Sequence, residues 1–265
     1  RTRLSENLFA GLSPWMQKLP GGLIHVNVVG CALFAAISGS SAATVATVGK
    51  MSIPELRKRK YPEKILLGSL AGSGTLGLLI PPSIILIIYG VTVQESIAKL
   101  FIAGIIPGIM IALIFMSYVI IWSLINKKSM PKYVENFSFL EKIRKSKQLL
   151  PVIILISAVI GSIYTGVATA TEAASLGVVG ALILSYFQKS LTIETFKQSL
   201  LGATKTSCMI AFILAGSTFL SLAMGFTGLP RNLAIWIQNM ELSPYVLIFV
   251  LMIFYIILGM FLDGI

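Results

Sequence analysis

Small polar residues gather at two places inside apolar runs of this chain. One group follows the apolar run from Leu23 to Ile37, and the other interrupts the run from Ile65 to Tyr89. Hydroxyl oxygens and the carbonyl groups freed beside glycines are neutral ligands, and several of them together suit Na⁺ better than a divalent cation. We therefore expect one sodium site formed by Ser38, Gly39, Ser40, Ser41, Ser73, Gly74 and Thr75.

A carboxylate occupies a similar place at the other end of the chain. Asp263 is the sole acidic residue embedded in an apolar run, and Gly264 follows it. A charge at membrane depth costs several kcal/mol, so such a residue is expected to have a functional partner. Asp263 and Gly264 thus predict a second sodium site, incomplete here because the chain stops at Ile265.

An anionic substrate has few side chains to bind it. Neither group of polar residues contains a lysine or an arginine. Helix N-termini attract anions through their exposed N–H groups and their dipole. We expect a carboxylate to depend on such groups, on hydroxyls and on the bound cations, with the substrate near Ser41, Thr44, Pro81, Pro82 and Ser83.

The composition sets the class of protein. Apolar residues make up 56% of the 265 residues and charged residues only 12%, and the mean hydropathy is +0.90. These values predict an all-α polytopic membrane protein. The net charge of +11 lies in short loops, which argues against a nucleic-acid partner. Two isolated cysteines, Cys31 and Cys208, suggest neither a disulfide framework nor a metal site.

The elements that must position these residues are interrupted helices. Leu23 to Ile37 is 15 residues, short of the ~20 needed to cross a bilayer. Residues 20–50 therefore predict a re-entrant hairpin, whose freed backbone is tolerated only where it lines a cavity or is buried in protein. Residues 72–83 contain glycines followed by Pro81 and Pro82, which predict a broken helix. The alternative is a kinked helix that uses its small residues for packing.

The rest of the chain supplies arms and spans. Leu100 to Ile125 is an ordinary span, and Thr169 and Glu172 have capping-box spacing at the start of a later one. His25 is expected to be packed or interfacial. We expect both ends to be truncated. The predicted parts are an amphipathic arm helix (1–19), hairpin 1 (20–50), a cytoplasmic basic loop and broken helix (51–90), mainly scaffold helices (91–226), a second arm (227–243) and the first half of hairpin 2 (244–265).

The two ends of the chain repeat one pattern in opposite orientation. A short amphipathic helix, a proline, an apolar run and a small or polar tip occur in the same order, with 19 residues from Pro20 to Gly39 and 19 from Pro244 to Asp263. Five intervening spans invert the second copy, as in many secondary transporters. With the base of hairpin 1 in the cytoplasm, only Lys99 and Arg231 of the 21 basic residues lie outside, which fixes the orientation.

Four motifs resemble the large membrane subunit of TRAP (tripartite ATP-independent periplasmic) transporters. They are the runs 37–43 and 72–83, the helix start Thr171-Glu172-Ala173-Ala174 and the run 259–264. The likeness extends through the whole chain and is greatest to the sialic-acid members with fused small and large subunits, as in Haemophilus. Asp263 would need a broken helix that this chain lacks.

The resemblance implies further properties of the intact protein. It implies an elevator mechanism in the bacterial inner membrane, with Na⁺ as the coupling ion, no other cofactor and no enzymatic activity. The implied partners are a small four-helix membrane subunit, fused or separate, a periplasmic substrate-binding protein and an organic acid, with sialic acid expected.

Three other functions remain open from the residues. A stand-alone Na⁺/carboxylate symporter of similar architecture would transport free substrate without a binding protein. A passive anion channel would need no Na⁺ gradient. A purely structural subunit would leave Asp263 unexplained. We expect Asp263→Asn and Ser40→Ala to weaken the Na⁺ dependence of uptake.

Overall fold

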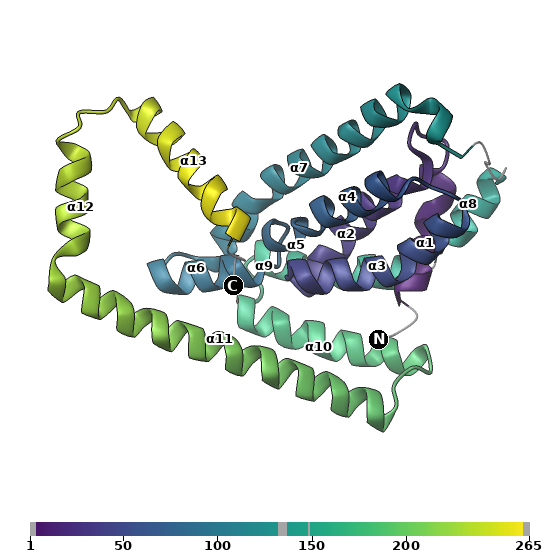
Figure 1. The fold of residues 1–265 in the computed structure, drawn as a ribbon. Helices are drawn as coiled ribbons and strands as arrows, with labels where there is room; N and C mark the ends of the chain where they lie inside the picture. The colour runs from purple at the N-terminus through teal and green to yellow at the C-terminus, as the bar shows by residue number, and fades with distance from the viewer. Residues whose placement is uncertain (1–3, 132–136, 148, 262–265) are drawn as a thin grey trace. The chain divides into compact units, whose positions relative to one another are not determined.

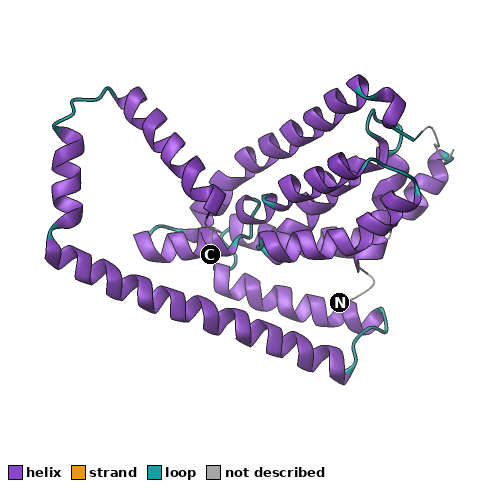
Figure 2. Cartoon of the chain, in the orientation of Figure 1, coloured by secondary structure: helices purple, strands orange, loops and turns teal. Residues whose placement is uncertain are grey.

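The computed structural model describes residues 4–131, 137–147 and 149–261. The described residues contain helices and loops and no strand (Figure 2), so the predicted all-α class is confirmed. The chain divides into two compact units, Arg1–Leu191 and Thr192–Ile265, and each is described separately. Asp263 and Gly264 lie outside the described residues.

The first unit is built around three helices that lie side by side, α2, α3 and α4 (Figure 1). Their apolar faces, with α1, bury a core that includes Leu8, Ile24, Leu56 and Leu66. Close packing of such side chains supplies the van der Waals contacts that hold helices together in a bilayer. The helices are α1 (Leu4–Met16), η1 (Gly22–Ile24), α2 (His25–Ser38), α3 (Ser41–Lys58) and α4 (Glu63–Gly74).

Helix α2 and helix α3 form a helical hairpin in the region where the sequence predicts a re-entrant one. The chain reverses at Gly39 and Ser40, and Cys31 of α2 then packs against Val48 of α3. Helix α2 has 14 residues, or about 21 Å at 1.5 Å per residue, which is too short to cross a bilayer. The second helix is longer than predicted. It continues to Lys58 through Pro54, so the expected loop after residue 50 is mostly helix.

The broken helix follows the hairpin. It consists of α4, the single turn α5 (Leu76–Leu79) and α6 (Ile84–Val93). Thr75 keeps helical backbone angles, whereas Ile80 and Ser83 are extended. The main interruption therefore lies at Ile80–Ser83, because the two prolines lack N–H donors and restrict the residues before them.

Helix α7 (Ile97–Ile125) packs its glycines on this interruption. A Cβ on Gly104 would lie 2.9 Å from the carbonyl oxygen of Leu79, and one on Gly108 would lie 2.9 Å from Cγ1 of Ile80. The spacing of four residues puts both glycines on one face of the helix, which lets the two backbones approach closely. The 3-10 turn η2 (Lys127–Ser129) follows.

The first unit ends with α8 (Phe139–Ser146), α9 (Leu150–Tyr164) and α10 (Ala170–Phe187). The predicted capping box at the start of α10 is confirmed. The Thr169 N–H donates to Oε2 of Glu172 over 2.8 Å, and the Glu172 N–H donates to Oγ1 of Thr169 over 3.3 Å. Helix α9 has 15 residues, fewer than an independent span needs.

The second unit contains α11 (Ile193–Thr227), α12 (Leu229–Gln238) and α13 (Pro244–Phe261). Within the described residues, five helical segments are long and apolar enough to cross a membrane, or six if α8 and α9 count as one bent span. Helix α13 is one of them. The order of a short amphipathic helix followed by an apolar helix recurs, as predicted, while the inversion between the copies and the re-entrant path remain predictions.

Candidate functional site

The tip of the hairpin is a tight turn that requires one residue with left-handed backbone angles. Gly39 ends α2 with φ +59°, and its N–H donates to the carbonyl oxygen of Ala35 over 2.9 Å. Ser40 is extended and caps α3, with its Oγ accepting from the N–H of Ala43 over 3.5 Å. Glycine adopts this conformation without the steric cost that a side chain adds, so the sequence sets the turn.

Hydroxyl groups are linked to one another directly behind the turn. Oγ1 of Thr44 donates to the carbonyl oxygen of Ser40 over 2.7 Å, and Oγ of Ser38 lies 2.7 Å from Oγ1 of Thr44. Oγ of Ser38 also lies 3.3 Å from the Ser40 carbonyl oxygen, to which it can donate. Thr44 is fully buried. Ser38, Ser40 and Thr44 therefore form a pre-organised cluster of neutral oxygens.

The interruption of the broken helix lies against this tip. The N–H of Ile84 donates to the carbonyl oxygen of Gly39 over 3.3 Å. A Cβ on Gly39 would lie 2.9 Å from the carbonyl oxygen of Pro82, and one on Gly77 would lie 2.7 Å from the carbonyl oxygen of Ser40. The tip thus contacts the broken helix on both sides of its interruption, at Gly77 before it and at Pro82 and Ile84 in and after it.

Four helix ends meet in this place. Helices α3 and α6 begin there, with Ser40 and Ser83 as their caps, and helices α2 and α5 end there. Helix N-termini favour negative charge, and the unpaired carbonyl groups at C-termini favour cations. The junction can therefore accommodate a cation and an anionic group close together without any charged side chain.

The predicted ligands are only partly brought together. Gly74 packs against Val45 beside the tip. The hydroxyl of Ser73 points elsewhere, donating to the carbonyl oxygens of Ser69 over 2.5 Å and Asn27 over 3.4 Å. Thr75 is exposed and donates to the carbonyl oxygen of Gly72 over 2.7 Å. The side chain of Ser73 thus faces α2, whose residue Asn27 lies away from the tip.

The predicted substrate residues lie at the same junction. Ser83 is fully buried, caps α6 and donates to the carbonyl oxygen of Leu78 over 2.5 Å. The hydroxyl of Thr44 is likewise used internally. Ser41 is half-buried, and its hydroxyl makes no hydrogen bond within the described part of the chain. Of the three predicted hydroxyls, Ser41 therefore has the greatest capacity to meet a ligand.

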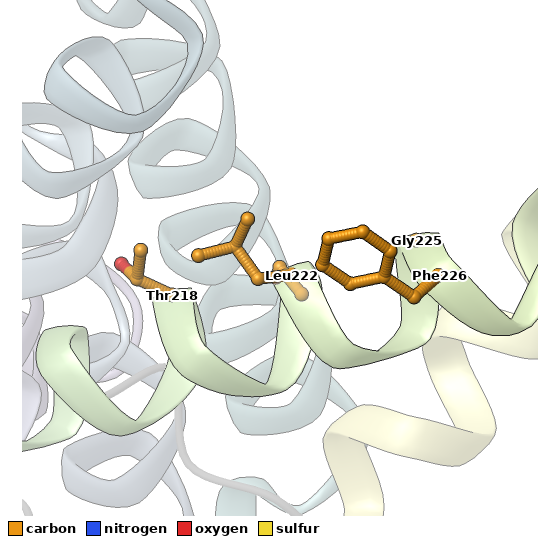
Figure 3. A pocket seen from close by; sticks show the side chains of 5 residues that line it. Thr218, Leu222, Gly225 and Phe226 are labelled. Carbon is orange, nitrogen blue, oxygen red and sulfur yellow. The ribbon is translucent and has the colours of Figure 1, made fainter.

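An apolar cavity of about 330 Å³ adjoins the tip. Ile37 and Pro82 line one side, and side chains of α9 and α10 line the other, with no charged residue among them. A second hollow, of about 460 Å³, runs along one face of α11 between Thr218 and Phe226 (Figure 3). Only residues of α11 line it, so it lacks the convergent polar groups of a binding site.

The single histidine of the chain has a structural role. His25 is fully buried, with Nε2 2.8 Å from the carbonyl oxygen of Pro20, so the prediction of a packed residue is confirmed. The described residues contain no group of three metal-ligating side chains from His, Cys, Asp or Glu.

Sequence reasoning missed the contacts of Gly77, Gly104 and Gly108, although the four-residue glycine spacing in α7 was an available signal.

A family model described as the DctM component of the tripartite ATP-independent periplasmic transporter matches residues 1–265. The chain belongs to this family. TRAP transporter permeases of this family are inner-membrane proteins, and the apolar helices described above agree with a multi-pass protein.

Three relatives illustrate the range of the TRAP family. The chain is 34% identical to a C4-dicarboxylate large permease from Pseudomonas aeruginosa, over 92% of this chain and 56% of the relative. It is 31% identical to the isethionate permease DctMQ from Oleidesulfovibrio alaskensis, over 98% of this chain and 41% of that relative. It is 31% identical to the sialic acid large permease SiaM from Vibrio cholerae, over 98% of this chain and 61% of that relative. The chain thus spans about half the length of these curated relatives.

Proposed function

We propose that this chain is part of the translocation subunit of a Na⁺-coupled, binding-protein-dependent importer of organic acids. The proposal rests on one observation above all: the hairpin tip and the interruption of the broken helix meet, joined by the bond from the Ile84 N–H to the Gly39 carbonyl oxygen. Transporters build ion and substrate sites where discontinuous helices meet at membrane depth.

The coupling ion in this proposal is Na⁺ at the hairpin tip. Ser38, Gly39 and Ser40 supply hydroxyl and carbonyl oxygens, and the turn before the interruption, near Gly74 and Thr75, supplies main-chain oxygens. These ligands are neutral, which suits a monovalent hard cation. Ser73 contributes through its carbonyl group only, because its hydroxyl is bonded within α4 and towards α2.

The substrate in this proposal is an organic acid held beside the cation. The N-termini of α3 and α6 attract the carboxylate, Ser41 donates a hydrogen bond, and Thr44, Pro81, Pro82 and Ser83 shape the surface. The bound Na⁺ adds positive charge that no side chain at the tip provides, so cation and anion bind together. This mutual dependence is the coupling between the two fluxes.

The cargo is proposed as a class, and sialic acid is one member of it. The relatives are named for a C4-dicarboxylate, isethionate and sialic acid at 31% to 34% identity, so identity favours none of them. A second Na⁺ at Asp263 and Gly264 and an elevator movement of the hairpin complete the proposal. Its partners are a periplasmic binding protein and a small membrane subunit, and the name DctMQ of one relative fits a fused arrangement.

Uptake into liposomes tests this function. The full-length protein with its small subunit is reconstituted with an inward Na⁺ gradient, and labelled C4-dicarboxylate, isethionate and sialic acid are offered with and without the cognate binding protein. We expect uptake of one acid that needs both the gradient and the binding protein. Uptake of free acid without the binding protein would favour a stand-alone symporter, and uptake without a Na⁺ gradient would favour a channel.

Two substitutions locate the ion sites in the same assay. Ser40→Ala and Asp263→Asn are each expected to raise the Na⁺ concentration for half-maximal uptake, while Ser199→Ala, an exposed position on α11, serves as the control. Unchanged Na⁺ dependence in both variants would refute the site assignment and leave the family membership intact.

A further inference from the structure

Helix α8 lies beside the C-terminal end of α1, and aromatic and polar contacts hold it there. Nε1 of Trp15 donates to Oγ of Ser146 over 2.8 Å. The rings of Trp15 and Phe139 meet edge to face with their centroids 6.4 Å apart, and Nζ of Lys142 lies 5.3 Å from the centroid of the Trp15 ring. These contacts fix which side of α8 faces α1 and which side is open.

The open side of α8 is apolar. The side chains of Phe139, Leu140 and Ile143 are 66%, 79% and 42% exposed. At 3.6 residues per turn they fall within an arc of about 100°. Trp15, at 41% exposed, borders this arc. Exposed apolar side chains on one stripe of a short polar helix are typical of a helix that lies in a membrane interface.

The segment that contains the apolar stripe is rich in basic residues. The described residues from 126 to 147 contain one acidic residue, Glu141, which accepts from the N–H of Ser138 over 2.8 Å as part of a capping box. None of the basic side chains in this stretch forms an ion pair within the described residues. They are Lys127, Lys128, Lys142, Arg144, Lys145 and Lys147.

The chain keeps α8 close to the start of α9. Helix α7 ends at Ile125, and the apolar helix α9 begins at Leu150, four residues after the end of α8. Four residues span at most about 14 Å, so the end of α8 lies within that distance of the start of α9, which our topology puts at the cytoplasmic side. Lysines and arginines in that position attract anionic lipids, and the attraction fades within a Debye length.

We propose that α8 and Trp15 form a docking surface for anionic phospholipid headgroups of the cytoplasmic leaflet. The lipid phosphates pair with Arg144 and Lys147, which are exposed and lie over no aromatic ring of the described residues. Lys142 and Lys145 lie over the rings of Trp15 and Phe137. Phe139, Leu140 and Ile143 insert between the headgroups. The surface anchors the loop between α7 and α9 to the bilayer. This role is independent of the Na⁺ sites proposed above.

Fluorescence of Trp15 tests the proposal in the full-length protein. A variant with phenylalanine at its other tryptophan positions is reconstituted into phosphatidylcholine nanodiscs that carry brominated acyl chains either on phosphatidylglycerol or on phosphatidylcholine at equal fraction. We expect brominated phosphatidylglycerol to quench Trp15 more strongly, and added salt to reduce the difference. In Arg144→Gln/Lys147→Gln, local enrichment of phosphatidylglycerol should fall roughly fivefold for each charge removed.

A matched variant separates the local effect from the loss of net charge. Lys189→Gln/Lys197→Gln removes two exposed charges, one from the turn after α10 and one from the first turns of α11, and should leave the quenching of Trp15 unchanged. Equal quenching by the two brominated lipids in the parent protein would overturn the proposal. So would a preference for phosphatidylglycerol that survives in Arg144→Gln/Lys147→Gln. If neither brominated lipid quenches Trp15, a protein partner covers the surface, and that result would also overturn the proposal.

Discussion

Gly39→Ala is the substitution that most directly tests the contact between the hairpin tip and the broken helix. Gly39 has φ +59°, and an added Cβ would lie 2.9 Å from the Pro82 carbonyl oxygen and 3.2 Å from the Ile84 nitrogen. Left-handed geometry costs a residue with a side chain about 1–2 kcal/mol. Overpacking against atoms that cannot move aside adds about 1–3 kcal/mol. We expect a total loss of about 2–5 kcal/mol.

A second glycine separates the two contributions. Gly166 has φ +72°, and a Cβ added there would have no other atom within 4 Å, so Gly166→Ala should lose only the conformational part, about 1–2 kcal/mol. The free energy of unfolding is measured by denaturant titration of the full-length protein in micelles. The Na⁺ concentration for half-maximal uptake is measured in liposomes, where each 1.4 kcal/mol lost from the bound state is a tenfold rise.

The two variants make the outcome decisive. If the tip and the interruption meet as described, Gly39→Ala is the less stable of the two and requires at least tenfold more Na⁺, whereas Gly166→Ala keeps the parental Na⁺ dependence. Equal stability and equal Na⁺ dependence in both variants would show that the carbonyl oxygen of Pro82 is not next to the turn, and the proposed site would have to be abandoned.

Three further substitutions probe the surroundings of the site. Thr44→Val removes a buried hydroxyl and leaves the Ser40 carbonyl oxygen without its 2.7 Å donor, so we expect a loss of about 1–3 kcal/mol in unfolding free energy, largely restored in Thr44→Ser. Gly104→Ala should destabilise the protein in thermal unfolding more than Gly161→Ala, because only the first added carbon would meet a backbone carbonyl; equal melting temperatures would contradict that packing. Thr169→Ala should cost about 1 kcal/mol and Thr169→Gly only a few tenths, the order expected if this residue caps its helix, and the reverse order in denaturant titration would exclude the cap.

Much of the hairpin and the break could be predicted because glycine and proline determine backbone geometry locally. Gly39 ends α2 wherever the helix packs, and two prolines interrupt the next helix in any surroundings. The capping box of α10 is equally local. The length of α3 was not predictable in this way, since Pro54 indicates an earlier end while burial of Ser52 and Leu56 against α2 and α4 keeps the segment helical. Tertiary packing outweighed local preference there.

The direction of side chains was the other limit of sequence reasoning. Ser73 and Thr75 are two positions apart, which on a helix is about 200° of rotation. One hydroxyl therefore faces α2 and the other faces outward. A polar motif identifies the region of a site, but which of its hydroxyls reach a ligand depends on the rotation of the helix about its axis, which neighbouring elements determine. Asp263 remains a prediction because it lies outside the described residues.

The closest link between turn and break joins two peptide groups, the carbonyl of Gly39 and the N–H of Ile84. Every residue carries such a carbonyl group, so no substitution at position 39 removes it. A substitution there can only push the two segments of backbone apart. Homologues could carry other residues in place of the serines and threonines at the tip and still offer this main-chain oxygen to an ion. The requirement at position 39 is the absence of a side chain, because the Pro82 carbonyl oxygen and the Ile84 nitrogen already crowd the place of a Cβ.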